Sequence, residues 1–130
     1  MKSVIAASVA ALCGLTIAVA AAPAGVAKDG DVIRRGNCTG STDWKLKLSE
    51  EDGRIEVEFE VDQNRNGVSW NVRLFQNGSQ IARATRVTRG PSGSFEFRKV
   101  APNTAGTDSF RARATRASGE VCNGRASASF

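Results

Sequence analysis

The sequence predicts an all-β protein, a seven-stranded antiparallel β-sandwich that follows a helical N-terminal signal peptide. Three observations support this prediction. Apolar and polar residues alternate along short segments, which is the pattern of strands with one buried face. Turn residues interrupt this alternation about every ten residues. After the first apolar segment, no stretch of the chain shows the period of a helix.

The first 27 residues have the three parts of a secretory signal peptide. Lys2 is basic, residues 4–22 carry no charge, and small residues follow Pro23. We expect cleavage after Ala27, with Ala24 as the second candidate. The alternative is an uncleaved membrane anchor, but Ala is weakly apolar and no basic cluster follows the segment directly. The expected product is extracellular or held at the cell surface, without stable membrane insertion after cleavage.

The remaining chain divides into a short extension and one domain. Residues 28–41 are expected to form an N-terminal extension that carries Cys38, and residues 42–130 to form the sandwich. The second predicted strand has the clearest alternation, and its glutamates Glu56, Glu58 and Glu60 are expected to face solvent. Asn77-Gly78 is a strong signal for a two-residue hairpin turn. The seven strands are predicted at residues 44–48, 55–61, 68–75, 80–88, 95–98, 110–115 and 121–130.

The strand count and Trp70 point to an immunoglobulin-like or fibronectin III-like sandwich, in which a Trp of the third strand is often buried. Cys38 and Cys122 remain after cleavage, and an even number of cysteines in an exported chain predicts a disulfide. The first and last strands begin at the same end of such a sandwich, which brings these two residues together. Closing so long a loop would stabilise the fold by about 4–5 kcal/mol in the chain-entropy model.

Several segments carry a resemblance that spans nearly the whole mature chain. They are CTGSTDWKLKLSEEDGRIEVEFEVD from Cys38, the later PSGSFE, and GEVC, which ends at Cys122. With the Ala-rich signal and the Trp of the third strand, they resemble small secreted actinobacterial proteins of unknown function. The resemblance implies export and the sandwich fold. It implies no catalytic residues.

The residue types present argue against an enzyme. The chain has no His, which removes Ser–His–Asp and Cys–His catalysis and imidazole metal sites. It also has no Tyr, which removes the phenol chemistry of sialidase-type sites. Asp62-x-Asn64-x-Asn66-Gly67 matches the first half of a calcium loop, but the twelfth position, where a Glu ligand belongs, is Arg73. We therefore expect no catalytic residues, no metal site and no cofactor.

Charge is distributed unevenly along the chain. Residues 28–64 contain six basic and ten acidic residues, whereas residues 65–130 contain eleven basic and three acidic. The second strand is expected between neighbours that supply Lys45, Lys47 and Arg98, so its sheet should neutralise itself. The other sheet should expose a basic face without carboxylates, formed by Arg73, Arg111, Arg113 and Arg125. The loops at the Cys38 end would add Arg65, Arg89 and Arg116.

These patterns predict a secreted, non-enzymatic binding or surface-accessory module that contacts anionic partners through its basic face. The specific partner is unknown; the candidates are a cell-wall polyanion and an acidic protein. Nucleic acid is disfavoured because Phe75 is the only aromatic residue expected on the face. The alternative is a secreted inhibitor of an extracellular hydrolase, acting through the loop Arg89-Gly90-Pro91-Ser92.

Overall fold

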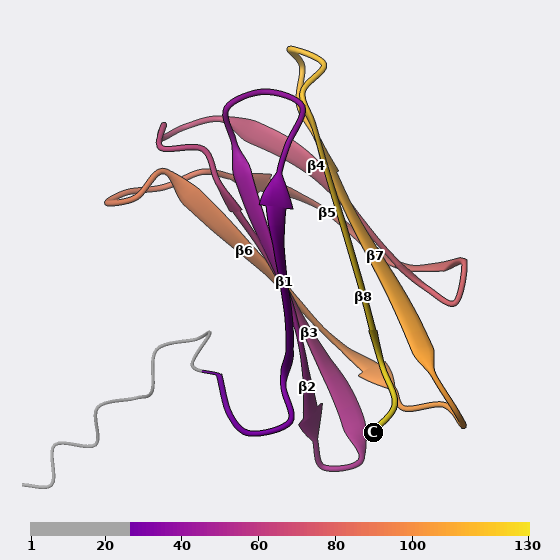
Figure 1. The fold of residues 1–130 in the computed structure, drawn as a ribbon. Helices are drawn as coiled ribbons and strands as arrows, with labels where there is room; N and C mark the ends of the chain where they lie inside the picture. The colour runs from indigo at the N-terminus through magenta and orange to yellow at the C-terminus, as the bar shows by residue number, and fades with distance from the viewer. Residues whose placement is uncertain (1–26) are drawn as a thin grey trace, which may run out of the picture.

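The computed structural model describes residues 27–130, so the predicted signal peptide at residues 1–27 lies almost entirely outside the described residues. The described chain forms two four-stranded antiparallel sheets, as Figure 1 shows. The first sheet has the order β1-β2-β3-β6, and the second has the order β5-β4-β7-β8. The strands are β1 (Val32–Asn37), β2 (Asp43–Glu51), β3 (Arg54–Asp62), β4 (Ser69–Gln76), β5 (Ser79–Val87), β6 (Ser94–Pro102), β7 (Asp108–Thr115) and β8 (Val121–Ala128).

The predicted all-β, two-sheet antiparallel arrangement is confirmed, but the predicted count of seven strands is wrong. The additional strand is β1, within the segment expected to be an extension, and it pairs with β2 along its whole length. Its sequence VIRRGN gives no clean alternation, because two consecutive arginines, Arg34 and Arg35, interrupt it. Its strand conformation depends on pairing with the edge of a sheet rather than on local pattern.

Two tight turns connect neighbouring strands, and one of them is the predicted turn at Asn77-Gly78. Asp52 and Gly53 join β2 to β3, and Asn77 and Gly78 join β4 to β5. All four residues have positive φ, between 48° and 84°. Such turns match the twist of paired strands, and Asn, Asp and Gly tolerate this backbone conformation best.

The inward faces of the two sheets form one hydrophobic core. Trp70, predicted to be buried, is fully inaccessible, and its indole Nε1 donates a hydrogen bond of 3.1 Å to Gln63 Oε1. The other fully buried large apolar side chains are Phe59, Leu46, Leu48, Ile55, Leu74, Val57, Val61 and Val72.

The predicted disulfide between Cys38 and Cys122 is confirmed, with the two Cα atoms 4.2 Å apart. Cys38 directly follows β1, and Cys122 lies near the start of β8. Beside the bridge, the Thr39 amide donates to the Val121 carbonyl at 2.9 Å, and the Val121 amide donates to Thr39 Oγ1 at 3.0 Å. The bridge and these bonds join the edges of the two sheets at one end of the molecule. A disulfide fits an oxidising compartment.

Candidate anion-binding face

In the sheet formed by β1, β2, β3 and β6, the three glutamates of β3 form ion pairs with basic residues of β2 and β6, as predicted. Lys45 Nζ lies 3.3 Å from Glu60 Oε2, and Lys47 Nζ lies 2.9 Å from Glu58 Oε2. Arg98 of β6 contacts both Glu56 and Glu58. One detail differs from the expectation: Glu58 does not face solvent, because its side chain is only 3% exposed. Cross-strand ion pairs therefore cover much of this face.

The opposite sheet has no such balance. Strands β4, β5 and β8 contain no Asp or Glu, and the only acidic residue of β7, Asp108, is fully buried. Arginines project from all four strands of this sheet. Among residues 27–130, none of Arg73, Arg83, Arg111, Arg113 and Arg125 has an ion pair within 4.0 Å. We call the outward surface of β4, β5, β7 and β8 that carries these five residues the basic face.

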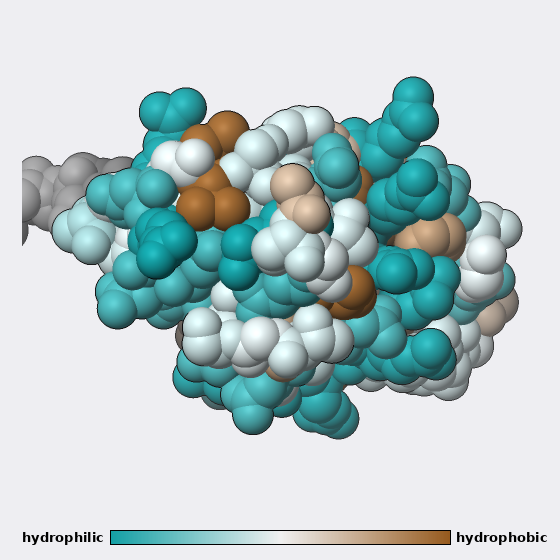
Figure 2. Space-filling view, turned by 90° about the horizontal axis from the view of Figure 1, so that it is seen from above, coloured by the Kyte–Doolittle hydropathy of each residue, from teal (hydrophilic) through white to brown (hydrophobic). Residues whose placement is uncertain are grey.

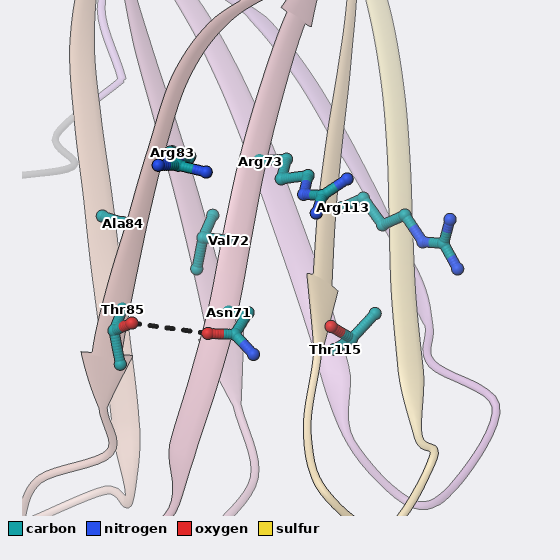
Figure 3. Close-up of a pocket in the computed structure, with 8 residues that line it drawn as sticks. All are labelled: Asn71, Val72, Arg73, Arg83, Ala84, Thr85, Arg113 and Thr115. Carbon is teal, nitrogen blue, oxygen red and sulfur yellow. Dashed lines mark hydrogen bonds between the residues drawn. The ribbon is translucent and has the colours of Figure 1, made fainter.

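Three arginines form a row across neighbouring strands. Arg73 on β4 is directly opposite Arg83 on β5 and Arg113 on β7. All three are exposed. The next row toward the start of β4 contains the polar residues Asn71, Thr85 and Thr115, and Thr85 Oγ1 lies 3.4 Å from Asn71 Oδ1. As Figure 3 shows, these six side chains line a shallow concavity of about 560 Å³ together with Val72 and Ala84.

A pair of arginines lies two residues nearer the start of β7 than the row of three. Arg111 is opposite Arg125 on β8 and opposite Phe75 on β4. The Arg111 guanidinium lies over the Phe75 ring, 4.3 Å from its centre. Ser109 and Ser127, whose hydroxyl oxygens are 3.1 Å apart, continue the face beyond this pair. Phe75, Arg111, Arg125 and the two serines help to line a second concavity of about 350 Å³.

The register brings like charges to neighbouring positions of this face, so their mutual repulsion is unfavourable unless an anion is bound. Like charges directly opposite each other on neighbouring strands repel. The rows place three and two arginines at directly paired positions of neighbouring strands, with no Asp or Glu among them. A surface of one sign attracts counter-charged ligands and raises their local concentration. The face is therefore suited to bind an anion that bridges neighbouring arginines.

The structure brings the four arginines predicted for this face onto one surface and adds Arg83. Arg83 was missed because the register between β4 and β5 shifts at Leu74/Phe75. Counting directly from the Asn77-Gly78 turn would place Ala82 opposite Arg73 and turn Arg83 inward. The bulge inserts Ile81 as an extra residue, which moves Arg83 to the outer face.

The three arginines predicted for the loops do not form one group of equivalent side chains. Arg65 and Arg89 are exposed, in the loops that precede β4 and β6. Arg116 is half-buried: its Nε donates to Glu120 Oε1 at 2.9 Å, and its guanidinium lies 5.5 Å from the centre of the Trp70 ring. Figure 2 views this end of the molecule, which is mainly hydrophilic with small apolar areas.

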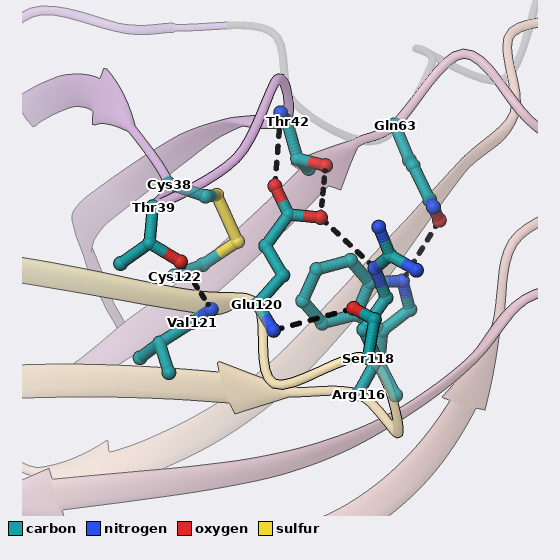
Figure 4. Close-up of a disulfide and its surroundings, with 10 residues drawn as sticks. Cys38, Thr39, Thr42, Gln63, Arg116, Ser118, Glu120, Val121 and Cys122 are labelled. Atoms are coloured by element: carbon teal, nitrogen blue, oxygen red, sulfur yellow. Dashed lines mark hydrogen bonds and ion pairs between the residues drawn. A yellow bond between two sulfur atoms is a disulfide. The ribbon is translucent and has the colours of Figure 1, made fainter.

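Glu120 is the residue that organises this end, and sequence reasoning missed it. Figure 4 shows it beside the disulfide, accepting hydrogen bonds from the Thr42 amide, from Thr42 Oγ1 and from Arg116. Burial alone would raise the pKa of the Glu120 carboxyl, but the bonds from Arg116 and Thr42 outweigh it, so the pKa is lowered. Arg116 is thus a structural partner of Glu120.

The segment 62–67, which matches the first half of a calcium-binding loop, connects β3 to β4. The Asn64 amide donates to Asp62 Oδ1 at 3.2 Å, and Asn64 has a φ of 57°, which Asn tolerates. Across residues 27–130, no group of three or more His, Cys, Asp or Glu side chains is placed to hold a metal ion.

Comparison with known proteins assigns no family: no family model, curated protein or solved structure matches this chain. Within the part of the chain that the structure describes, no helix is long and apolar enough to cross a membrane.

Proposed function

We propose that this protein is an exported, non-enzymatic binding module that contacts an anionic partner outside the cell or at its surface through the basic face. The observation that carries the proposal is the contrast between the two sheets. One sheet pairs the three glutamates of β3 with basic residues of the neighbouring strands, while the other aligns five arginines with no carboxylate among them.

Two further observations support the proposal. The disulfide fits an oxidising compartment, in agreement with the export predicted from the N-terminal sequence. The strand orders place β3 between β2 and β6, and β7 between β4 and β8, as expected for an immunoglobulin-like sandwich. Such a sandwich presents a rigid sheet surface on which arginine positions are set by register.

The test is retention on an immobilised sulfated polysaccharide, such as heparin, as salt is raised. The wild-type protein should be retained at low salt and elute as salt screens the charges. The variant Arg73→Gln/Arg113→Gln should elute at clearly lower salt. The control Arg34→Gln/Arg35→Gln loses the same charge from exposed positions on β1, in the other sheet, and should elute close to wild type.

Two results would contradict the proposal. Wild-type protein that passes through at low salt would exclude polyanion binding by this face. Equal shifts for the two double variants would show that retention follows net charge rather than the arrangement of the arginines.

A second candidate is inhibition of an extracellular hydrolase through the exposed loop at residues 89–92. The loop is a closed turn: the Arg89 carbonyl accepts from the amides of Gly93 and Ser94, at 2.9 and 3.2 Å. The Arg89 amide also donates to the Ser94 carbonyl at 3.0 Å. A protease groove that binds an extended segment would require these bonds to open, so we place the basic face first. Titration against a panel of secreted proteases tests this candidate, with Arg89→Ala as the matched variant.

A further inference from the structure

We propose that the ligand of the basic face is a linear polymer of sugar or polyol units that carries phosphate or sulfate groups, but no nucleobases, on successive units. One such group would lie over the row Arg83, Arg73 and Arg113, and another over the pair Arg111 and Arg125. This inference rests on the proposed function and specifies the chemistry of its ligand.

The spacing of the arginines favours one shape of anion. Arg73 and Arg113 are paired on neighbouring strands about 4.8 Å apart, and Figure 3 shows both side chains extending in the same direction across the sheet. One small anion can therefore contact both guanidinium groups. Each guanidinium offers several N–H donors in a fixed plane. A phosphate or sulfate presents oxygens in several directions and can accept from both, whereas a carboxylate has two oxygens in one plane. The row therefore fits a tetrahedral oxyanion better than a carboxylate.

Neutral polar side chains lie on both sides of the arginines. Asn71, Thr85 and Thr115 follow the three-arginine row on one side, and Ser109 and Ser127 follow the second pair on the other. These neutral side chains both donate and accept hydrogen bonds, which matches the hydroxyl groups of a sugar or polyol. The Phe75 ring is covered by Arg111 at 4.3 Å and offers no open platform on which a nucleobase could stack.

The two groups of arginines are spaced for a ligand with a repeated anion. Arg113 and Arg111 lie two residues apart on β7, a separation of about 6.8 Å along the strand. The second pair is also displaced by one strand toward β8. The positive charges thus form an oblique stripe from β5 to β8 that passes over both concavities. An extended chain with an anion on successive units can occupy both positions at once, and the second contact is then favoured by effective concentration.

The experiment compares four probes at equal concentration of charge and equal salt, with affinity measured by calorimetry. They are polyglycerol phosphate, heparin, polygalacturonate and oligo-dT. We expect polyglycerol phosphate or heparin to bind at least about tenfold more tightly than the carboxylate polymer and the oligonucleotide, because one additional charged hydrogen bond contributes about this factor. Tighter binding of polyglycerol phosphate identifies the oxyanion as phosphate, and tighter binding of heparin identifies it as sulfate.

Variants test the two positions separately. Arg73→Gln/Arg113→Gln and Arg111→Gln/Arg125→Gln should each weaken binding of the preferred polymer by about tenfold or more. The variant Asn71→Ala/Thr115→Val keeps every arginine. It should reduce the ratio of the affinity for the preferred polymer to the affinity for oligo-dT. Arg34→Gln/Arg35→Gln is the charge-matched control and should bind like wild type. Thermal unfolding of each variant establishes that it is folded.

The outcomes separate the inference from the proposed function. If all four polymers bind equally and the arginine variants abolish this binding, the basic face binds anions but the ligand class is wrong. Tighter binding of polygalacturonate or oligo-dT would likewise overturn the ligand class alone. If none of the four polymers binds the folded wild-type protein at low salt, the proposed function fails together with the inference.

Discussion

Lys47 and Glu58 form an ion pair of 2.9 Å on the outward side of β2 and β3, although their side chains are only 4% and 3% exposed. Their neighbours provide part of the cover, since Ile33 pairs with Lys47 and Arg98 pairs with Glu58 in the sheet register. A buried ion pair is sensitive to the loss of one partner, because the remaining charge keeps the cost of desolvation.

Removing the carboxylate of this pair should destabilise the fold. We expect Glu58→Gln to lower the free energy of unfolding by about 3 kcal/mol, the lower end for a broken buried pair. The double variant Lys47→Met/Glu58→Leu should recover most of this loss, because it removes both charges. Urea denaturation at neutral pH measures both values. A single variant as stable as wild type would contradict this dependence of the fold on the Glu58 charge.

Trp44 should make the neighbouring glycines intolerant of a side chain. A Cβ atom added to Gly124 of β8 would lie 2.8 Å from the Trp44 ring, and one added to Gly36 of β1 would lie 2.6 Å from it. We expect Gly124→Ala to cost about 1–3 kcal/mol through overpacking. In the background of Trp44→Phe the same substitution should cost less, which a double-mutant cycle by thermal unfolding detects. If the effects of Gly124→Ala and Trp44→Phe on stability simply add, the cost of Gly124→Ala does not come from contact with Trp44.

Loss of the disulfide should lower stability more than any surface change. The bridge spans 84 residues, for which the chain-entropy model gives about 4–5 kcal/mol. We expect Cys38→Ala/Cys122→Ala to lower the melting temperature strongly relative to the oxidised protein. Wild-type protein under reducing conditions should behave similarly. Unchanged melting in both cases would mean that the bonds between Thr39 and Val121 hold this end without the bridge.

The fold should lose stability in acid because two buried carboxylates are held in their ionised form. Burial raises the pKa of Asp108, but hydrogen bonds from Thr104, Asn77 and Gln76 lower it further than burial raises it. Glu120 behaves in the same way. Since the folded pKa values lie below the ordinary 3.8 and 4.5, the stabilisation is present above these values. It is lost as pH falls through the lower, folded values.

Unfolding in urea between pH 3 and pH 7 measures this dependence. Asp108→Asn should be less stable than wild type at pH 7, and the difference should shrink toward pH 3. Glu50→Gln, at an exposed position, is the control and should follow the wild-type curve. Glu96 acts in the opposite direction, because burial and then Glu58 raise its pKa. A difference between wild type and Asp108→Asn that is constant with pH would contradict the assignment.

The sequence predicted those parts of the fold in which polar and apolar residues alternate and typical turn residues mark the ends of the strands. The glutamates of β3 alternate with apolar residues, and Asn77-Gly78 sets a hairpin, so these elements and their neighbours could be placed from the sequence. The edge strand β1 could not be placed from the sequence, because its strand conformation depends on hydrogen bonds to the edge of β2. The burial of Glu58 likewise depends on side chains from three other strands.

The candidate site was predictable in part for a similar reason. Alternation alone placed Arg73, Arg111, Arg113 and Arg125 on one outer surface. Arg83 joins them only because a bulge shifts β5 by one residue, and such a bulge has no distinct local signal in this sequence. Arg116 and Glu120 are only four positions apart, but their ion pair forms across a turn. The sequence alone did not predict the shape of that turn.

The position of the disulfide also determines how the domain would respond to mechanical load. β1 runs from the end that carries the C-terminus toward Cys38, and β8 runs back from Cys122, as Figure 1 shows. Tension on both ends of the domain would peel β1 and β8 apart only as far as the covalent bridge. The force would then pass from sulfur to sulfur, and strands β2 to β7 would stay folded under a pull that extends only the outer two.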